Sequence, residues 1–167
     1  MLSDLISGEL PYLRRYARAL LGTRSAGDAA VETMLETKML VMLGQGKTVA
    51  QRKDLFRALD ETIMEELSDG KLNQEVAKIL RSMTTDERRA VMLTAVEGFS
   101  IFETAEILST STSFVEEALT NAETSLQSAL STTVLVIEDE ILIAEMLAGI
   151  VLEAGHSILG IATTHRQ

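Results

Sequence analysis

Residues 84–130, TTDERRAVMLTAVEGFSIFETAEILSTSTSFVEEALTNAETSLQSAL, decide the fold of this chain. A Ser or Thr stands three residues before a Glu at Thr84–Glu87, Ser100–Glu103 and Ser113–Glu116. This spacing is typical of a capping box, in which the two side chains satisfy amides at the start of a helix. Gly98 predicts a left-handed end to the first helix. Three capped helices joined by short turns indicate a helix-turn-helix module.

The third helix of this module takes the place of a DNA-reading helix but is acidic. Its sequence includes Glu116, Glu117 and Glu123, and no Lys or Arg occurs between Arg89 and Arg166. Neutralisation of phosphates supplies nearly all non-specific DNA affinity, so we expect this helix to be repelled from a duplex. The apolar residues of the helix keep a spacing that predicts one buried stripe. They are Val115, Ala118, Leu119, Ala122, Leu126 and Leu130.

The same stretch resembles the promoter-reading carboxyl-terminal domain of extracytoplasmic-function sigma factors. The residues that carry the resemblance are DERRAVMLTAVEGFS at 86–100, followed by Glu103, Ala105, Glu106 and Ile107. A recognition helix in that family has basic residues, which this chain lacks. The resemblance therefore implies the scaffold of a sigma factor without the basic residues that bind DNA.

Composition narrows the class of protein. The chain has 167 residues, a formal net charge of −10 and no cysteine, which argues against nucleic acid as the main partner and rules out a disulfide framework. No apolar run reaches the roughly 18 residues of a membrane span, and the amino terminus lacks a signal pattern. We expect a cytoplasmic protein that has no membrane partner. The chain shows no glycine-rich phosphate loop, no Cys/His metal spacing and no nucleophile–base set, so we expect neither an enzyme nor a resident cofactor.

The first 68 residues predict a small helical domain. One helix ends at Gly22, with Pro11 in its first turn, and Ser25 caps the next. A further capping box at 48–51 predicts a helix whose inner face carries Leu55, Phe56, Leu59, Ile63 and Leu67. The segment AGDAAVETM at 26–34 looks like the polymerase-binding helix of the sigma amino-terminal domain.

After residue 131 the pattern changes to that of a βαβ unit. Residues 134–137, VLVI, predict a parallel strand buried on both faces. A helix at 141–154 closed by Gly155 and a second strand at 158–162 complete the unit. Two strands and one helix leave a bare apolar face, which we expect to pack on the helices, to pair with a second molecule, or to be poorly ordered.

The segment VLVIEDE at 134–140 resembles the opening of response-regulator receiver domains. By that resemblance Glu138 and Asp139 are the carboxylates that hold magnesium in a complete receiver, and Mg²⁺ prefers such hard oxygen ligands. The family places its phosphoacceptor aspartate after a third strand, and no third strand precedes Gln167. We therefore expect this pair to be inert here, with no phosphoacceptor in this chain.

The predicted fold class is mainly α. Two small sigma-like helical domains, residues 1–68 and 71–131, are joined at Ser68–Gly70, and a helix at 72–81 leads into the second. A βαβ fragment of an α/β receiver domain, residues 132–167, follows. This order resembles the PhyR-type regulators of the bacterial general stress response.

That resemblance implies a sigma-factor mimic that binds a NepR-like anti-sigma factor and so releases the true sigma factor by partner switching. A histidine kinase would act on the receiver of a full-length member; here we expect binding that is independent of phosphorylation. The alternative is a DNA-binding sigma factor or another helix-turn-helix transcription regulator. A titration of promoter DNA across salt concentrations separates the two readings.

Candidate partner contacts form two groups. The basic residues Arg14, Arg15 and Arg18 are expected to pair with acidic partner residues, although a simply solvated face is the alternative. The apolar candidates are exposed edges in grooves between and along the two helical domains, where amphipathic partner helices would dock. They are Leu20, Leu21, Val96, Phe99, Phe102 and Phe114, each of which is alternatively a core residue.

Overall fold

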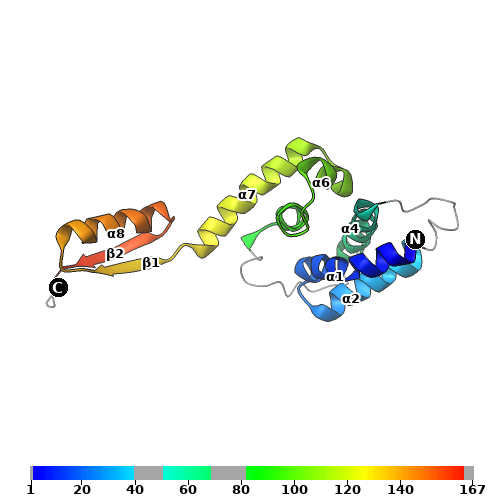
Figure 1. Ribbon diagram of the computed structural model, residues 1–167, viewed down its shortest axis with the longest axis horizontal. Helices are drawn as coiled ribbons and strands as arrows, with labels where there is room; N and C mark the ends of the chain where they lie inside the picture. Colours follow the sequence, from blue (N-terminus) through cyan, green and yellow to red (C-terminus); the bar gives the residue numbers. More distant parts are fainter. Residues whose placement is uncertain (1, 40–50, 69–81, 164–167) are drawn as a thin grey trace. The chain divides into compact units, whose positions relative to one another are not determined.

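The computed structural model describes residues 2–39, 51–68 and 82–163 (Figure 1). It divides into two compact units, Met1–Ala122 and Glu123–Gln167, here called the helical unit and the βαβ unit. The fold class is confirmed as mainly α with a small parallel sheet. The predicted linker at 69–70 and the predicted helix at 72–81 lie outside the described residues.

The first helix, α1 (Leu2–Leu21), runs through Pro11 without a break, so the prediction of a helix that starts near Pro11 is wrong. The reason lies in the packing. Leu5, Ile6 and Leu10 pack against the same core as Leu13. Apolar contacts therefore stabilise the helix on both sides of the proline. The helix ends at Gly22, as predicted, where a positive φ of 82° turns the chain.

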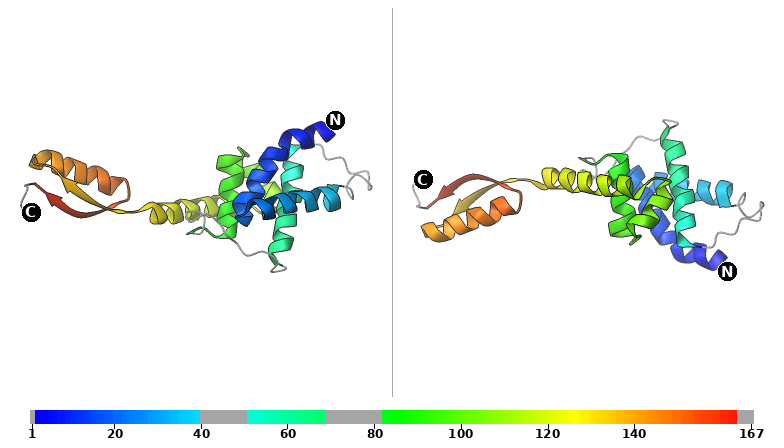
Figure 2. Two further views of the ribbon diagram at one scale, coloured as in Figure 1. Left: turned by 90° about the horizontal axis from the view of Figure 1, so that it is seen from below. Right: turned by 90° about the horizontal axis from the view of Figure 1, so that it is seen from above.

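The second helix, α2 (Arg24–Met34), lies beside α1 (Figures 1 and 2) and continues into the π-helical turn η1 (Leu35–Met39). Thr23 caps it, because the amide of Ala26 donates to the Thr23 hydroxyl at 3.1 Å. The prediction of Ser25 as the cap is wrong by two residues. Gly27 lets the two helices approach, since a Cβ there would lie 2.5 Å from Cγ of Arg18.

The next described helix, α4 (Arg52–Ser68), begins after the predicted box at 48–51, of which residues 48–50 lie outside the described part. Its start is stabilised instead by Asp54, whose carboxylate accepts the Gln51 amide at 3.1 Å. The predicted inner face is confirmed. Leu55, Phe56, Leu59 and Ile63 are buried, and Leu67 is partly buried against the same core.

The helix-turn-helix module consists of α5 (Thr85–Val91), the π-helical turn η3 (Met92–Val96), α6 (Ile101–Leu108) and α7 (Thr112–Leu130). The first two predicted capping boxes are present with both of their hydrogen bonds. Gly98 has a φ of 77° and ends the first helix as predicted. The third predicted box is wrong, because the amide of Phe114 donates to the Ser111 hydroxyl at 3.1 Å, one position before the helix begins.

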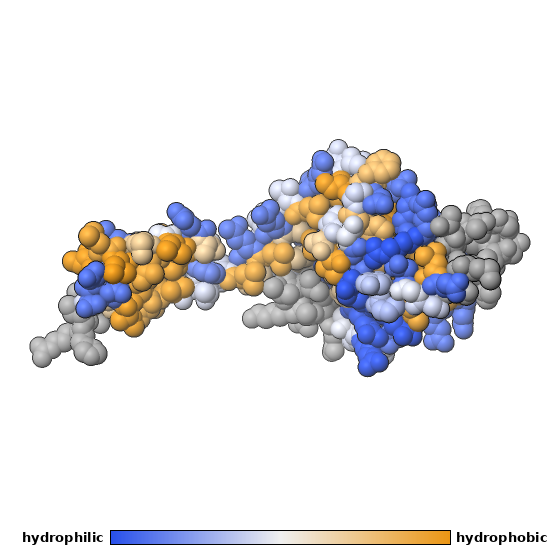
Figure 3. Space-filling model, viewed as in Figure 1, coloured by the Kyte–Doolittle hydropathy of each residue, from blue (hydrophilic) through white to orange (hydrophobic). Residues whose placement is uncertain are grey.

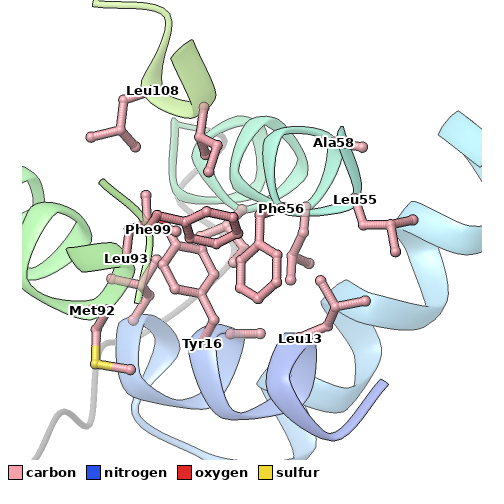
Figure 4. Packing of buried hydrophobic residues seen from close by; sticks show 14 of the residues in the cluster. Leu13, Tyr16, Leu55, Phe56, Ala58, Met92, Leu93, Phe99 and Leu108 are labelled. Atoms are coloured by element: carbon pink, nitrogen blue, oxygen red, sulfur yellow. The ribbon is translucent and has the colours of Figure 1, made fainter. Parts of the chain in front are cut away.

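The helical unit has one continuous core that draws on α1, α2, α4 and the helix-turn-helix module (Figure 4). Phe56 stands at its centre, with its ring 5.7 Å from that of Tyr16 and 5.0 Å from that of Phe99, both in edge-to-face geometry. The amino-terminal half (residues 2–68) and the helix-turn-helix half (residues 82–122) therefore pack as one unit. The predicted boundary near residue 70 does not divide the structure into compact units.

The predicted stripe on α7 is correct only over its first half. Val115, Ala118 and Ala122 are buried, whereas Leu130 is 56% exposed. The helical unit ends at Ala122, so the later apolar positions of the stripe have no core of that unit to enter.

The βαβ unit contains β1 (Thr133–Ile137), α8 (Ile141–Glu153) and β2 (Ser157–Ala162), with parallel pairing as predicted. Burial of β1 on both faces is wrong. Val136 and Ala144 are buried, but Ile137 is 76% exposed and Leu159 is 72% exposed. One helix covers only one face of a sheet, and the apolar colour of Figure 3 spreads over this unit. The expected bare apolar surface is therefore present.

Candidate protein-docking surface

Three of the predicted apolar partner contacts are exposed on the helix-turn-helix half. Val96 ends η3, Phe102 stands in the first turn of α6, and Phe114 stands in the first turn of α7. Phe102 is 65% exposed, the largest such fraction among the aromatic side chains that the structure describes. Phe102 and Phe114 are exposed although their helices also bury residues in the same turns, such as Thr104 and Val115. Their role as contacts stays a prediction.

The other three apolar candidates are wrong as exposed edges. Leu20, Leu21 and Phe99 are buried and belong to the core. Phe99 lies between the two halves, where a docking groove is predicted, and its ring packs on Phe56. Helical spacing cannot distinguish a residue buried inside one domain from one that covers a partner.

The outer face of α7 is acidic in the structure as in the sequence. Glu116, Glu117 and Glu123 are all exposed, and no basic residue occurs in α7. Carboxylates on this face oppose a phosphate backbone, and the helix supplies no cation to replace the counterions that DNA binding releases. The face is therefore poorly suited to bind DNA.

Arg15 is already paired within the chain. Its guanidinium donates Nε to Oε1 and Nη2 to Oε2 of Glu97, each at 2.9 Å, although the two residues lie far apart in sequence. The carboxylate of Glu97 has no exposed surface. The hydrogen bond to Glu97 raises the pKa of Arg15 above its usual value, because it favours the charged guanidinium. Arg15 is therefore not an unpaired charge, and its predicted contact with an acidic partner residue stays a prediction.

Arg52 makes a second bridge to the same carboxylate. It donates Nη2 to Oε2 of Glu97 at 3.0 Å, Nη1 to the Glu97 carbonyl at 2.7 Å, and Nε to Glu9 at 2.7 Å. Its guanidinium also lies over the rings of Phe56 and Phe99, 4.9 and 4.5 Å from their centres. One arginine of α4 thus contacts α1 and the turn before α6.

Asp60 makes a third connection between the halves. Arg89 donates Nε to Oδ1 of Asp60 at 2.8 Å, and the buried Tyr16 hydroxyl donates to the same oxygen at 2.7 Å. Burial raises the pKa of Tyr16 well above its usual value, and the nearby Asp60 charge adds to this. On the same interface Glu106 accepts from Lys53 at 2.7 Å. Neither Asp60 nor Glu97 appears among the sequence-based candidates, because pairing across such distances in sequence leaves no local pattern.

Arg14, Arg18 and Arg24 gather around a single carboxylate, that of Asp28 on α2. Arg18 donates Nη2 to both oxygens at 2.6 and 3.0 Å, so its charge is satisfied internally. Arg14 and Arg24 lie farther off, with Nε–O distances of 3.6 and 3.7 Å. The hydrogen bond from Arg18 lowers the pKa of Asp28, and all three positive charges act in the same direction. The four arginines Arg14, Arg15, Arg18 and Arg24 form the main basic patch of the sequence, but the pairing of three of them with Asp28 has no local sequence signal.

Glu138 and Asp139 follow β1 as predicted, at the carboxyl end of the strand. The Glu138 carboxylate accepts the amide of Glu140 at 3.0 Å. The described residues contain no cluster of three or more His, Cys, Asp and Glu side chains that could hold a metal ion. Two neighbouring carboxylates, one of them engaged by the backbone, do not by themselves form the ligand set of a magnesium site. The assignment of these two residues stays a prediction.

In comparison with known proteins, each half of the helical unit matches a family model. Residues 6–60 match the family model described as the Sigma2 domain of PhyR. Residues 80–128 match the model described as the sigma-like domain of the response regulator PhyR. The Phyllosphere-induced regulator PhyR of Methylorubrum extorquens is 36% identical over 171 residues, which cover 99% of this chain and 64% of that protein.

Solved structures give the same picture. PhyR complexed with the anti-sigma factor NepR from Bartonella quintana is 32% identical, with a TM-score of 0.77, and the match covers 97% of this chain and 64% of that one. The sigma factor RpoE of the same organism, in complex with NepR, is 21% identical with a TM-score of 0.67 over 77% of this chain and 96% of that chain, which shows a shared fold.

This chain spans about 64% of the curated PhyR and of the PhyR structure from B. quintana. Within the described ranges, the structure has no helix that is both long enough and apolar enough to cross a membrane. The two domain models agree with the match to a curated relative, which covers 99% of this chain. The chain belongs to the family of PhyR-type regulators.

Proposed function

We propose that this chain is a sigma-factor mimic that binds a NepR-like anti-sigma factor and thereby takes part in a partner-switching stress response. One observation carries the proposal: the helix-turn-helix scaffold is complete, with two full capping boxes, while its reading helix exposes Glu116, Glu117 and Glu123 and has no basic residue. An anti-sigma factor recognises the shape of a sigma factor, whereas promoter DNA needs its charge.

The relatives support this proposal. The B. quintana PhyR and the B. quintana sigma factor RpoE were each solved in complex with NepR. Both share the fold of this chain. Two proteins of one fold that bind the same protein can present similar surfaces to it, and the helical unit of this chain has that fold.

Calorimetric titration tests the proposal with a NepR-like protein from the source organism and, separately, with promoter duplex DNA at several salt concentrations. We expect saturable binding of the anti-sigma protein with little dependence on salt, and no binding of DNA at physiological ionic strength. Affinity for DNA that falls steeply with salt would instead indicate a DNA-binding sigma factor.

The exposed aromatic residue at the start of α6 provides a sharper test. Phe102→Ser removes an apolar side chain that is 65% exposed, so it should leave the stability of the chain nearly unchanged. If Phe102 is buried against the anti-sigma factor in the complex, its loss should weaken binding by roughly tenfold or more. The matched control is Leu130→Ser, which removes an apolar side chain of similar exposure at the end of α7. Equal affinity of the two variants would exclude Phe102 from the contact.

A further inference from the structure

The cluster of Arg14, Arg18 and Arg24 around Asp28 carries a local excess of positive charge. Three guanidiniums face one carboxylate, so the cluster has a net charge of +2 on a chain whose net charge is −10. Arg18 holds the carboxylate closely, whereas the side chains of Arg14 and Arg24 are 46% and 84% exposed. Their guanidiniums lie beyond hydrogen-bond distance of Asp28, and so their N–H groups remain available.

No other basic side chain in the described ranges is in this position. Each of the rest donates at least one hydrogen bond within the chain. They are Arg15, Lys38, Arg52, Lys53, Arg57, Arg88 and Arg89, together with Arg18 itself. Arg14 and Arg24 are thus the two described cations whose donors are still free to bind a ligand.

We propose that Arg14 and Arg24 form a docking point for an acidic segment of a protein partner, one that supplies two or more carboxylates. The arginine fork matches a carboxylate, as the neighbouring pair of Arg18 and Asp28 already demonstrates. This docking point lies on α1 and α2 and is separate from the apolar residues of the helix-turn-helix half on which the proposed function depends.

The charge of this docking point fits an acidic peptide better than a nucleic acid. Duplex binding relies on many phosphate contacts, commonly about 6–10, and this surface offers two free guanidiniums. The remaining charge of the chain is strongly negative and would repel a long polyanion. A short acidic segment brings only a few charges and can enter the local positive field.

Arginine side-chain NMR tests the docking point directly. The probe is a peptide of about ten residues with alternating Glu and Ser, titrated into the ¹⁵N-labelled full chain at about 20 mM ionic strength, where screening is weak. The Nε–Hε signals of Arg14 and Arg24, identified by their loss in Arg14→Gln and Arg24→Gln, should shift in a saturable way. The double variant should bind the peptide about fivefold more weakly, as expected for the loss of two exposed ion pairs.

Lys38→Gln is the matched control for Arg24→Gln, because it also removes one positive charge but from a side chain already paired with Glu61 and Glu65. Its affinity for the peptide should equal that of the unchanged chain. The proposal is overturned if Arg24→Gln and Lys38→Gln bind alike, or if the two arginine signals stay still. It is also overturned if duplex DNA shifts those signals at lower concentration than the peptide does. None of these readouts involves the anti-sigma factor, so they stand apart from the test of the proposed function.

Discussion

Glu97 shows how a single buried charge can connect parts of a chain that are distant in sequence. Its carboxylate has no exposed surface, receives Arg15 from α1 and Arg52 from α4, and precedes the glycine that ends the first helix of the module. Desolvation of such a carboxylate is costly unless its partners are in place. The arrangement is therefore stable only when both halves of the helical unit are folded and in contact.

The substitution Glu97→Gln keeps the shape of this side chain but removes its charge. Arg15 and Arg52 then share a site without the carboxylate they enclose, and we expect the free energy of unfolding to fall by about 2–3 kcal/mol, below the full value for a buried pair because Arg15 is half-exposed. Urea unfolding followed by circular dichroism measures it. The control Glu61→Gln breaks an exposed pair with Lys38 and should cost less than about 0.5 kcal/mol. Equal losses in the two variants would contradict this role for Glu97.

Thr104 presents the opposite case, a buried polar group without a partner. Its side chain has no exposed surface, and its hydroxyl finds no hydrogen-bond partner within the described part of the chain. Thr104→Val keeps the shape and removes the unsatisfied hydroxyl, so the free energy of unfolding should rise by about 1 kcal/mol. Thr62→Val is the control, because that buried hydroxyl donates to the Ala58 carbonyl at 2.8 Å and its loss brings no comparable gain. A stability gain that is the same in both variants would show that the unpaired hydroxyl of Thr104 carries no special cost.

At this scale, prediction from the sequence succeeded where the signal is local. The inner face of α4 follows from helical spacing, and all of its first four predicted residues are buried. Spacing could not distinguish Leu20 and Leu21, which are buried within the unit, from exposed partner contacts. The pairing of Arg15 with Glu97 was unpredictable for another reason. The two residues lie more than eighty positions apart in sequence, so their contact can be predicted only when the fold is already known.

Helix ends are the elements for which the sequence was most informative. The boxes at Thr84 and Ser100 form as predicted, because Ser or Thr and Glu at this spacing satisfy each other's amides without help from the rest of the fold. The start of α7 departs from the pattern. Two further polar residues, Ser111 and Thr112, precede Ser113, and the turn after α6 brings Ser111 to the cap.

A pair of serine variants checks this cap. Ser111→Ala removes the acceptor of the Phe114 amide and should lower the free energy of unfolding by about 1 kcal/mol. Ser113→Ala lies inside the first turn of α7, where alanine is a better helix former, so its effect should be close to zero or slightly stabilising. Thermal unfolding of the two variants in parallel distinguishes the caps. A larger loss of unfolding free energy for Ser113→Ala than for Ser111→Ala would support the capping box that the sequence predicts.

Two glycines in open surroundings allow a test of backbone conformation alone. A Cβ added at Gly8 or at Gly98 meets no atom within 4 Å, but Gly98 has a φ of 77° and Gly8 lies inside α1. Gly98→Ala should therefore destabilise the chain by roughly 1–2 kcal/mol, the cost of a left-handed residue with a side chain. Gly8→Ala should stabilise it by about 0.5–1 kcal/mol through better helix propensity. Changes of the same sign, measured by urea unfolding, would contradict the assignment of Gly98 as a helix end.

On the scale of the whole molecule, the division of the chain was harder to predict than its elements. A break at Ser68–Gly70 suggested two helical domains, yet Tyr16, Phe56 and Phe99 join the two halves in one core. Composition shifts reveal linkers but give no information on whether the segments they join pack together. The change of pattern after residue 131 was a stronger signal, because strands and helices need different periods of apolar residues.

The apolar surface of the βαβ unit leads to the last prediction. Leu135, Ile137 and Leu159 on the strands and Leu142 on α8 are each at least half exposed, more than an isolated surface residue would explain. The chain of residues 1–167 should therefore bind the dye anilinonaphthalene sulfonate and associate as its concentration rises. Leu159→Thr, which places a good strand former at a position 72% exposed, should lower the dye fluorescence while amide exchange at Ser157 stays slow. Val136→Thr is the control: it buries a hydroxyl against α8, so it should speed amide exchange across the sheet. Unchanged fluorescence in Leu159→Thr, with the sheet intact, would mean that this surface is already covered in solution.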